Sequence, residues 1–245
     1  MIFDQSLLDK IRAEFPRAAR DASGRKRAFM DNGTGSLVVA RAARAESAAR
    51  VDCSANVGAI FRESKDAEAT ILGGRKAVAD LLNAPSHATI VSGESTTSLL
   101  FSLSYALGRE FTGHENVVTT DYEHYANVSP WIELEKRGTI REVRFARLDK
   151  AEGTLDLDHL ENLIDGNTKV VTVTAASNVL GTKSSLHEIR KLARARGAYF
   201  VVDAVHHAPH GPIDVQAIDC DFLVFSGYKM FSSHGSFLYG KEDLL

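Results

Sequence analysis

Short apolar segments alternate with longer amphipathic ones along most of this chain. Beyond Pro85, seven runs have the length and the β-branched or aromatic content of strands: Ala88–Val91, Val117–Thr120, Arg141–Phe145, Val170–Thr174, Tyr199–Val202, Phe222–Phe225 and Ser236–Tyr239. Helical patterns appear between several of them, at Leu99–Leu107, from Asp121 to Arg137, at Asp156–Ile164 and at Leu186–Arg196. Strands that alternate with helices are typical of βαβ units. The pattern therefore predicts an α/β fold with a mostly parallel, seven-stranded sheet flanked by helices.

The first third of the chain has a helical pattern instead. Apolar residues at helical spacing predict an amphipathic helix within residues 4–20, and Ala40–Ala49 and Ser64–Leu82 also read as helices. We expect an N-terminal helical segment over residues 1–30 and one large domain over residues 31–245. The last five residues have the pattern of a first helical turn, from which we expect the polypeptide to be a part of a longer one.

Composition describes a globular protein and excludes several classes of function. Hydrophobic residues make up 44% of the 245 positions and charged residues 25%. A net charge of −3, spread along the chain, gives no footprint for nucleic acid or an anionic membrane. No stretch approaches the roughly 18 apolar residues of a membrane span, and the N-terminus lacks the apolar core of a signal peptide. We expect a cytoplasmic protein with no nucleic-acid and no membrane partner.

Polar side chains follow several of the predicted strands at the point where each strand ends. Asp203 follows one, Ser226–Lys229 follows another, and Ser92–Thr97 lies between a strand and a helix. His124 and Asn178 come shortly after two more strands. Because the carboxyl ends of parallel strands meet at one edge of a sheet, we expect these residues to face one crevice.

A carboxylate and a lysine that converge at such an edge suit pyridoxal phosphate (PLP). The lysine forms a Schiff base with this cofactor, and the acid pairs with its pyridine nitrogen. Lys229 lies between the apolar run Phe222–Phe225 and Met230, and apolar surroundings favour the neutral amine that this bond requires. The hydroxyls and free backbone N–H groups of Ser92–Thr96 suit a phosphate.

Each of these residues, taken alone, also has an ordinary structural role open to it. Ser95 and Thr96 would cap a helix, and His124 would be an exposed or capping histidine. Asp203 would be a loop or capping residue, and Lys229 a surface lysine with its stem on apolar neighbours. It is their shared position at one sheet edge that favours the cofactor hypothesis.

Other kinds of site fit less well. The histidines at positions 206, 207 and 210 lack the spacing of a metal site, so we expect no metal. Gly33-Thr34-Gly35 lacks the rest of a dinucleotide fingerprint and is better understood as a tight turn. Two cysteines do not make a disulfide framework; Cys220 precedes an apolar strand, and nothing near Cys53 would activate it.

The chain resembles the class V aminotransferases, within the cysteine desulfurase-like group of fold-type I PLP enzymes. The resemblance is strongest in DYEHYANVSPW, ASNVLGT, VVDAVHHAPHGPIDVQAIDCDFLVFSGYKM and FLYG. It implies the three-layer large domain of that fold type. It also implies a role for each matching position: Lys229 as the Schiff-base lysine, Asp203 at the pyridine nitrogen, His124 stacked on the ring, Asn178 at the phenolic oxygen, Ser95, Thr96, Ser226 and Tyr228 near the phosphate, and His206 beside the cofactor.

The resemblance also implies an activity, with two departures from the family pattern. Desulfurases usually carry Gln at the position of His206 and often His at that of Tyr228. Family members continue beyond Leu245 into a C-terminal small domain, which holds the substrate-carboxylate arginine and the persulfide-forming cysteine; we expect this domain to be absent here. The implied reaction converts cysteine to alanine plus enzyme-bound sulfur, in a homodimer, with Lys229 and His124 as catalytic residues. The alternatives are another class V reaction (aminotransferase, epimerase or lyase) or a truncated PLP-binding domain without activity.

Overall fold

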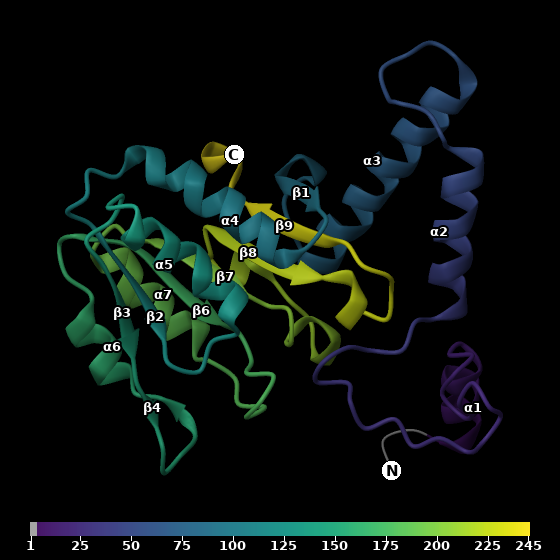
Figure 1. The fold of residues 1–245 in the computed structure, drawn as a ribbon, viewed down its shortest axis with the longest axis horizontal. Coiled ribbons are helices and arrows are strands. Elements are labelled where there is room, and N and C mark those ends of the chain that lie inside the picture. Colours follow the sequence, from purple (N-terminus) through teal and green to yellow (C-terminus); the bar gives the residue numbers. More distant parts are fainter. Residues whose placement is uncertain (1–3) are drawn as a thin grey trace. The chain divides into compact units, whose positions relative to one another are not determined.

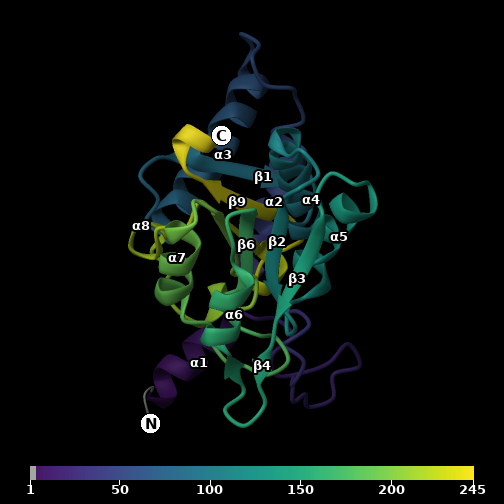
Figure 2. The same cartoon turned by 90° about the vertical axis from the view of Figure 1, so that its left-hand side faces the viewer.

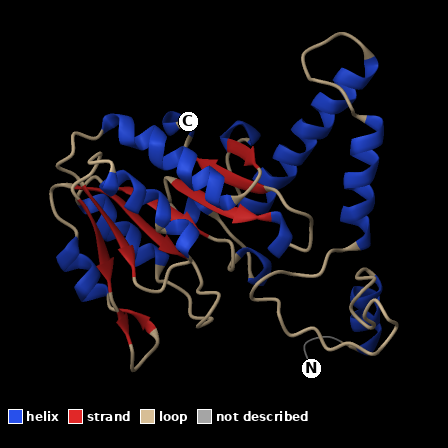
Figure 3. Ribbon diagram, viewed as in Figure 1, coloured by secondary structure: helices blue, strands red, loops and turns tan. Residues whose placement is uncertain are grey.

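A computed structural model describes residues 4–245, which form two compact units. The first unit contains the residues up to Gly74 together with Gly227–His234. The second contains Arg75–Ser226 and Gly235–Leu245, and it holds the entire seven-stranded sheet (Figures 1 and 3). The boundary that the sequence suggests near residue 30 stays a prediction.

The sheet of the second unit is mostly parallel, as the sequence pattern predicts. Its strands follow in the order β1 (Ile90–Gly93), β9 (Ser236–Gly240), β8 (Phe222–Ser226), β7 (Tyr199–Asp203), β6 (Thr168–Thr174), β2 (Asn116–Thr120) and β3 (Glu142–Ala146). All neighbours from β8 to β3 pair in parallel, whereas β9 is antiparallel to both β8 and β1. Because β9 is antiparallel to both of its neighbours, β1 runs the same way as β8.

Helices cover both faces of this sheet. Figure 2 shows α4 (Thr96–Leu107) and α5 (Ser129–Lys136) on one face and α7 (Leu186–Ala195) on the other. The shorter α6 (Leu157–Leu163) packs beside β3, and α8 (Val215–Ile218) contacts α7. The result is the three-layer α/β architecture.

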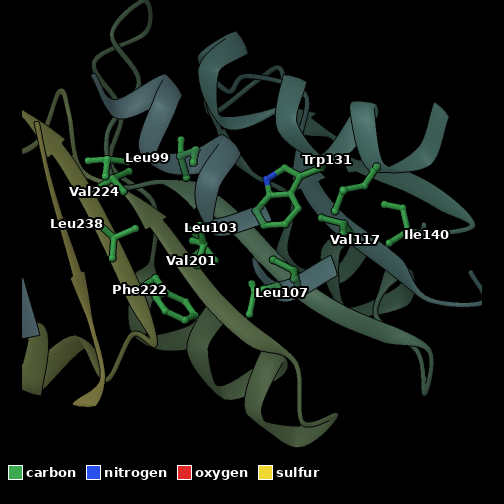
Figure 4. Close-up of a cluster of buried hydrophobic side chains, with 13 residues drawn as sticks. Leu99, Leu103, Leu107, Val117, Trp131, Ile140, Val201, Phe222, Val224 and Leu238 are labelled. Carbon is green, nitrogen blue, oxygen red and sulfur yellow. The ribbon is translucent and has the colours of Figure 1, made fainter. Parts of the chain in front are cut away.

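The main core lies between α4, α5 and the sheet (Figure 4). Leu103 and Leu107 of α4 point toward Trp131 of α5 and toward Val201 and Phe222 of the sheet, and all of them are buried. On β7 the neighbours of Val201 are also fully buried, and every residue of β8 is buried. Strands buried on both faces need continuous apolar runs, which explains the uninterrupted apolar sequence of these two strands.

The first unit is helical and also contains the segment around Lys229. It consists of α1 (Gln5–Ala13), α2 (Ala40–Asp52), the first part of α3 (Arg62–Leu82) and the short 3-10 helix η5 (Gly227–Lys229). Asp4 caps α1 by accepting a hydrogen bond from Leu7 N over 2.7 Å. Ser36 Oγ connects the two stretches of chain, because it donates to Tyr228 O over 2.7 Å and accepts from Phe231 N over 3.0 Å.

Several local elements differ from the sequence pattern. The helix expected from Asp121 begins only at Ser129, because a 3-10 turn, η3 (Tyr125–Asn127), comes first and Pro130 occupies the first turn of α5. The hairpin of β4 (Leu148–Asp149) and β5 (Thr154–Leu155) was not expected, since two-residue strands carry no periodicity. The remaining 3-10 helices are η1 (His87–Thr89), η2 (Gly108–Glu110), η4 (Ala208–His210) and η6 (Glu242–Leu244). Within residues 4–245, no helix combines the length and the apolar character that crossing a membrane requires.

Candidate active site

The register of the sheet brings several of the predicted residues to one edge of the second unit. Ser236, the first residue of β9, pairs with Gly93 on one side and with Ser226 on the other. Farther along, Asp203 pairs with Thr174. The last residues of β1, β8, β7 and β6 therefore lie along the same edge, as the sequence led us to expect.

The N-terminus of α4 reaches this edge at β1. Ser95 is the N-cap: its Oγ accepts from Ser98 N over 3.0 Å, and Ser98 Oγ accepts from Ser95 N over 3.2 Å. Thr96, in the first turn, is buried and donates from Oγ1 to Ser236 Oγ over 3.2 Å. Ser95 thus has the ordinary capping role, and the free N–H groups of this turn remain suited to an anion.

Ser226 carries the clearest unsatisfied group at the edge. Its side chain is only 1% exposed, and no residue in the described part of the chain forms a hydrogen bond with its Oγ. Buried hydroxyl groups in folded proteins nearly always have a partner, so this oxygen suits a ligand that enters the edge.

Asp203 is buried at the end of β7. It is 3% exposed, and its Oδ1 accepts from Val205 N over 2.9 Å. The turn that follows contains His206, whose ring lies 4.9 Å from that of His210. Burial lowers the pKa of the next residue, His207. A carboxylate fixed in this way has the chemistry to hold a protonated ring nitrogen.

His124 and Asn178 follow β2 and β6. His124 is exposed, and its Nδ1 accepts from Ala126 N over 3.1 Å at the start of η3. Asn178 is partly buried in the loop beyond Thr174. Both stand at carboxyl ends of strands of the same sheet; their contacts with a cofactor stay predictions.

Glu123 is a residue of this edge that the sequence reasoning did not single out. Its carboxylate accepts hydrogen bonds from Thr120 Oγ1 (2.7 Å), Thr174 N (2.8 Å) and Asn127 Nδ2 (2.8 Å). Burial, with a smaller effect of the negative charge of Asp203, raises its pKa to about 7 although three donors favour the ionised form. In the sequence, the one indication of this role is the position of Glu123 between the end of a predicted strand and His124.

Lys229 and Tyr228 belong to the first unit. Lys229 is 5% exposed, and its Nζ donates to Gly33 O over 2.9 Å. The ring of Tyr228 stacks on His234 at 5.3 Å, and a Cβ on Gly35 would lie 3.4 Å from that tyrosine ring. The Gly33–Gly35 loop is the expected tight turn, and it also closely approaches the lysine segment.

The comparison with known proteins identifies the family. Residues 28–245 match the family described as Aminotransferase class-V. The chain belongs to this family. This class V chain is 34% identical to a cysteine desulfurase of Pectobacterium atrosepticum, and the match covers 97% of this chain and 59% of that protein. It is 41% identical to a probable cysteine desulfurase of Synechocystis sp., over 70% of this chain and 41% of that protein.

Solved structures give the same answer for the fold. The chain matches the cysteine desulfurase CsdA from Escherichia coli with a TM-score of 0.83 and 27% identity, over 100% of this chain and 60% of that one. It matches an apo cysteine desulfurase from Thermococcus onnurineus NA1 with a TM-score of 0.85 and 30% identity, over 96% and 57% of the two chains. The class V chain thus spans about 60% of the length of these relatives.

The class V family depends on PLP, and the residues at the edge have the chemistry that PLP needs. The phosphate would meet the first turn of α4 and the unpartnered Ser226 Oγ, and the ring nitrogen would meet the buried carboxylate of Asp203. The described residues contain no group of three or more His, Cys, Asp or Glu side chains that could hold a metal ion.

Proposed function

We propose that this chain is the cofactor-binding part of a PLP-dependent enzyme that acts on a cysteine-like amino acid, as the names of its relatives indicate for those proteins. The observation that carries the proposal is the row of hydroxyls at the edge: Thr96 is bonded to Ser236, Ser236 pairs with Ser226, and Ser226 Oγ is buried without a described partner. A phosphate group would satisfy that hydroxyl together with the N–H groups of α4.

Each proposed contact gives one side chain a task. Asp203 would hold a proton on the ring nitrogen, since a buried carboxylate favours a cationic partner. His124 would lie against the ring, and Asn178, which can both donate and accept, would orient the phenolic oxygen. Ser95, Thr96, Ser226 and Tyr228 would contact the phosphate, and His206 would lie beside the cofactor.

When bound, PLP takes up the electron pair left at the substrate α-carbon. Lys229 would hold the cofactor covalently and, once released by the substrate amine, move a proton at the α-carbon. The sequence places Lys229 three residues after Ser226, and its side chain is 5% exposed.

The sulfur step of a desulfurase needs a thiolate acceptor. The C–S bond of cysteine breaks, the sulfur passes to that thiolate as a persulfide, and the carbon left behind takes a proton to give alanine. Cys220 is unsuited to this role, because it is fully buried and burial raises its pKa to about 12. We therefore propose that the acceptor is a thiol other than Cys220. We also propose that the enzyme works as a homodimer, as the resemblance to the family implies.

Borohydride trapping tests the cofactor assignment. The protein is incubated with PLP, reduced and digested, and the modified peptide is identified by mass spectrometry. We expect the label on Lys229, its loss in Lys229→Ala, and its retention in Lys136→Ala, a matched change on the exposed side of α5. Label that persists in Lys229→Ala, or that never forms, would contradict the assignment.

A substrate panel tests the reaction. With PLP bound, cysteine should give alanine in an amount equal to the sulfur released in the presence of a reducing thiol. Turnover of another amino acid with no alanine from cysteine would instead favour a different class V reaction. Trapped cofactor without any turnover would favour a binding domain that has no activity of its own.

A further inference from the structure

The side chain of Glu123 accepts three hydrogen bonds at this edge of the sheet. Its carboxylate joins three pieces of structure: Thr120 at the end of β2, Thr174 at the end of β6, and Asn127 in η3. Asn127 is fully buried, and its own Oδ1 accepts from Thr172 Oγ1 over 2.7 Å. An ionised carboxylate only accepts and has about four lone-pair sites, enough for these three donors.

These contacts fix the backbone that presents His124. Glu123 immediately precedes His124, and Asn127 N donates to His124 O over 2.8 Å, so Asn127 holds both residues. On the other side, Tyr122 OH lies 2.9 Å from Ser184 Oγ, which donates to Thr174 O over 2.6 Å. The segment is therefore tied to β6 immediately before His124.

The same contacts reach Asp203. Thr174 donates its N–H to Glu123, and Thr174 is the register partner of Asp203. The next residue continues the link, since Ala175 N donates to Asp203 O over 2.8 Å. The loop that carries His124 is thus joined through Glu123 to the end of β6, which in turn pairs with the strand end that carries Asp203.

We propose that Glu123 is a positioning residue of the cofactor site, which acts by holding His124 at a fixed place relative to the strand end that carries Asp203. The inference rests on the proposed PLP function. Glu123 itself is not expected to touch the reacting atoms; it acts through the backbone on either side of it.

A positioning role makes the length of the side chain matter more than its charge. Glu123→Gln keeps an oxygen for Thr120 and Thr174, and Asn127 can turn its amide so that its oxygen faces the new amide nitrogen and its nitrogen faces Thr172 Oγ1. Glu123→Asp keeps the charge but is one methylene too short to reach all three donors. Glu123→Ala removes every contact.

The experiment measures PLP affinity by fluorescence titration of the full chain, together with the unfolding midpoint of each variant. A stacked ring contributes up to about a tenfold change in affinity, so His124→Ala should weaken PLP by that order. We expect Glu123→Ala and Glu123→Asp to weaken it by a similar factor and Glu123→Gln to stay within about twofold of the wild type. Glu161→Ala and Glu161→Gln, on the exposed face of α6, should have no effect.

A double-mutant cycle decides whether Glu123 acts through His124. In the His124→Ala background, Glu123→Asp should change the PLP affinity by no more than about twofold. A change of that size is within the scatter with which the effects of independent mutations add. The inference would be overturned if the effects of the two substitutions were fully additive. It would also be overturned if Glu123→Asp and Glu123→Ala both bound PLP as tightly as the wild type. Weak PLP binding by Glu123→Gln together with normal binding by Glu123→Asp would overturn it as well. If Glu123→Ala does not fold, the Asp and Gln variants still decide it. A wild-type chain that binds no PLP would instead overturn the proposed function, and the inference with it.

Discussion

Leu99 occupies the space that a side chain on Gly93 would need. A Cβ built on Gly93 would lie 2.7 Å from Leu99 Cδ2 and 2.8 Å from its Cγ. Leu99 is buried in the main core, so it has little room to withdraw. This close approach lets the first turn of α4 reach the end of β1, where the phosphate site is proposed.

Gly93→Ala should therefore destabilise the protein. Overpacking in a filled core costs about 1–3 kcal/mol of unfolding free energy, and urea denaturation measures it. Gly166→Ala is the matched control, because nothing lies within 4 Å of a Cβ there and its φ is not positive. Equal stability of the two variants would show that Leu99 moves aside freely.

Thr96→Val should also destabilise the second unit. Valine keeps the shape but leaves Ser236 Oγ, which is 2% exposed, without the donor 3.2 Å away. A buried group that loses its partner costs about 1–3 kcal/mol. The exposed neighbour Thr97→Val should stay within about 0.5 kcal/mol. A loss of the same size at both positions in chemical denaturation would argue against the buried hydrogen bond.

Asp221 should be the most sensitive of the charged residues that close the far end of the sheet. It is 7% exposed, accepts from Phe200 N over 2.7 Å, and forms ion pairs with Arg190 and Lys241. Asp221→Ala leaves the buried Phe200 N without its acceptor, while Arg190 and Lys241 keep their ion pairs with Asp219, so we expect a loss of about 1–3 kcal/mol of unfolding free energy. Thermal or urea unfolding checks this against Glu161→Ala, for which we expect no change.

Glu123 predicts a pH dependence of stability. Its pKa is raised to about 7 in the folded chain from an ordinary value of 4.5. Between these values the folded state holds a proton that the unfolded state has lost, so the free energy of unfolding should fall as pH rises through this window. The slope is at most about 1.4 kcal/mol per pH unit for one group.

Glu123→Gln isolates that effect. The variant cannot titrate, so its stability relative to the wild type should improve from pH 4.5 to 7 and then stay constant. Denaturation curves of both proteins at several pH values measure the difference. A difference that does not change with pH would mean that the carboxylate is ionised throughout this range in the folded protein.

The fold could be predicted largely from the sequence because its central strands are buried on both faces. Runs such as Phe222–Phe225 are apolar throughout, which is typical of a central strand covered by helices on either side. The direction of a strand was harder to predict than its existence. Nothing in the sequence Ser236–Tyr239 indicates that β9 is antiparallel to its neighbours. Where local geometry depends on a few hydrogen bonds, as in η3 before α5, periodicity placed the helix start too early.

The site could be predicted only in part. Residues immediately after strands, such as Asp203, are placed by the strand itself, so their arrival at one edge follows from the parallel sheet. Glu123 could not be recognised in this way, because its role depends on partners that come from β2, β6 and η3 together. Ser226 was expected, but that its hydroxyl would be the unsatisfied one depends on packing that no spacing reveals.

The position of β9 also has a consequence for biosynthesis. β1 lies at the margin of the sheet, and Ile90 pairs with Tyr239, so β1 leaves the ribosome long before its partner strand exists. At usual rates of translation the delay is on the order of 10 s. During that time the edge of β1 that β9 will cover is exposed, and nascent chains of this protein should depend on chaperones until Gly240 has emerged.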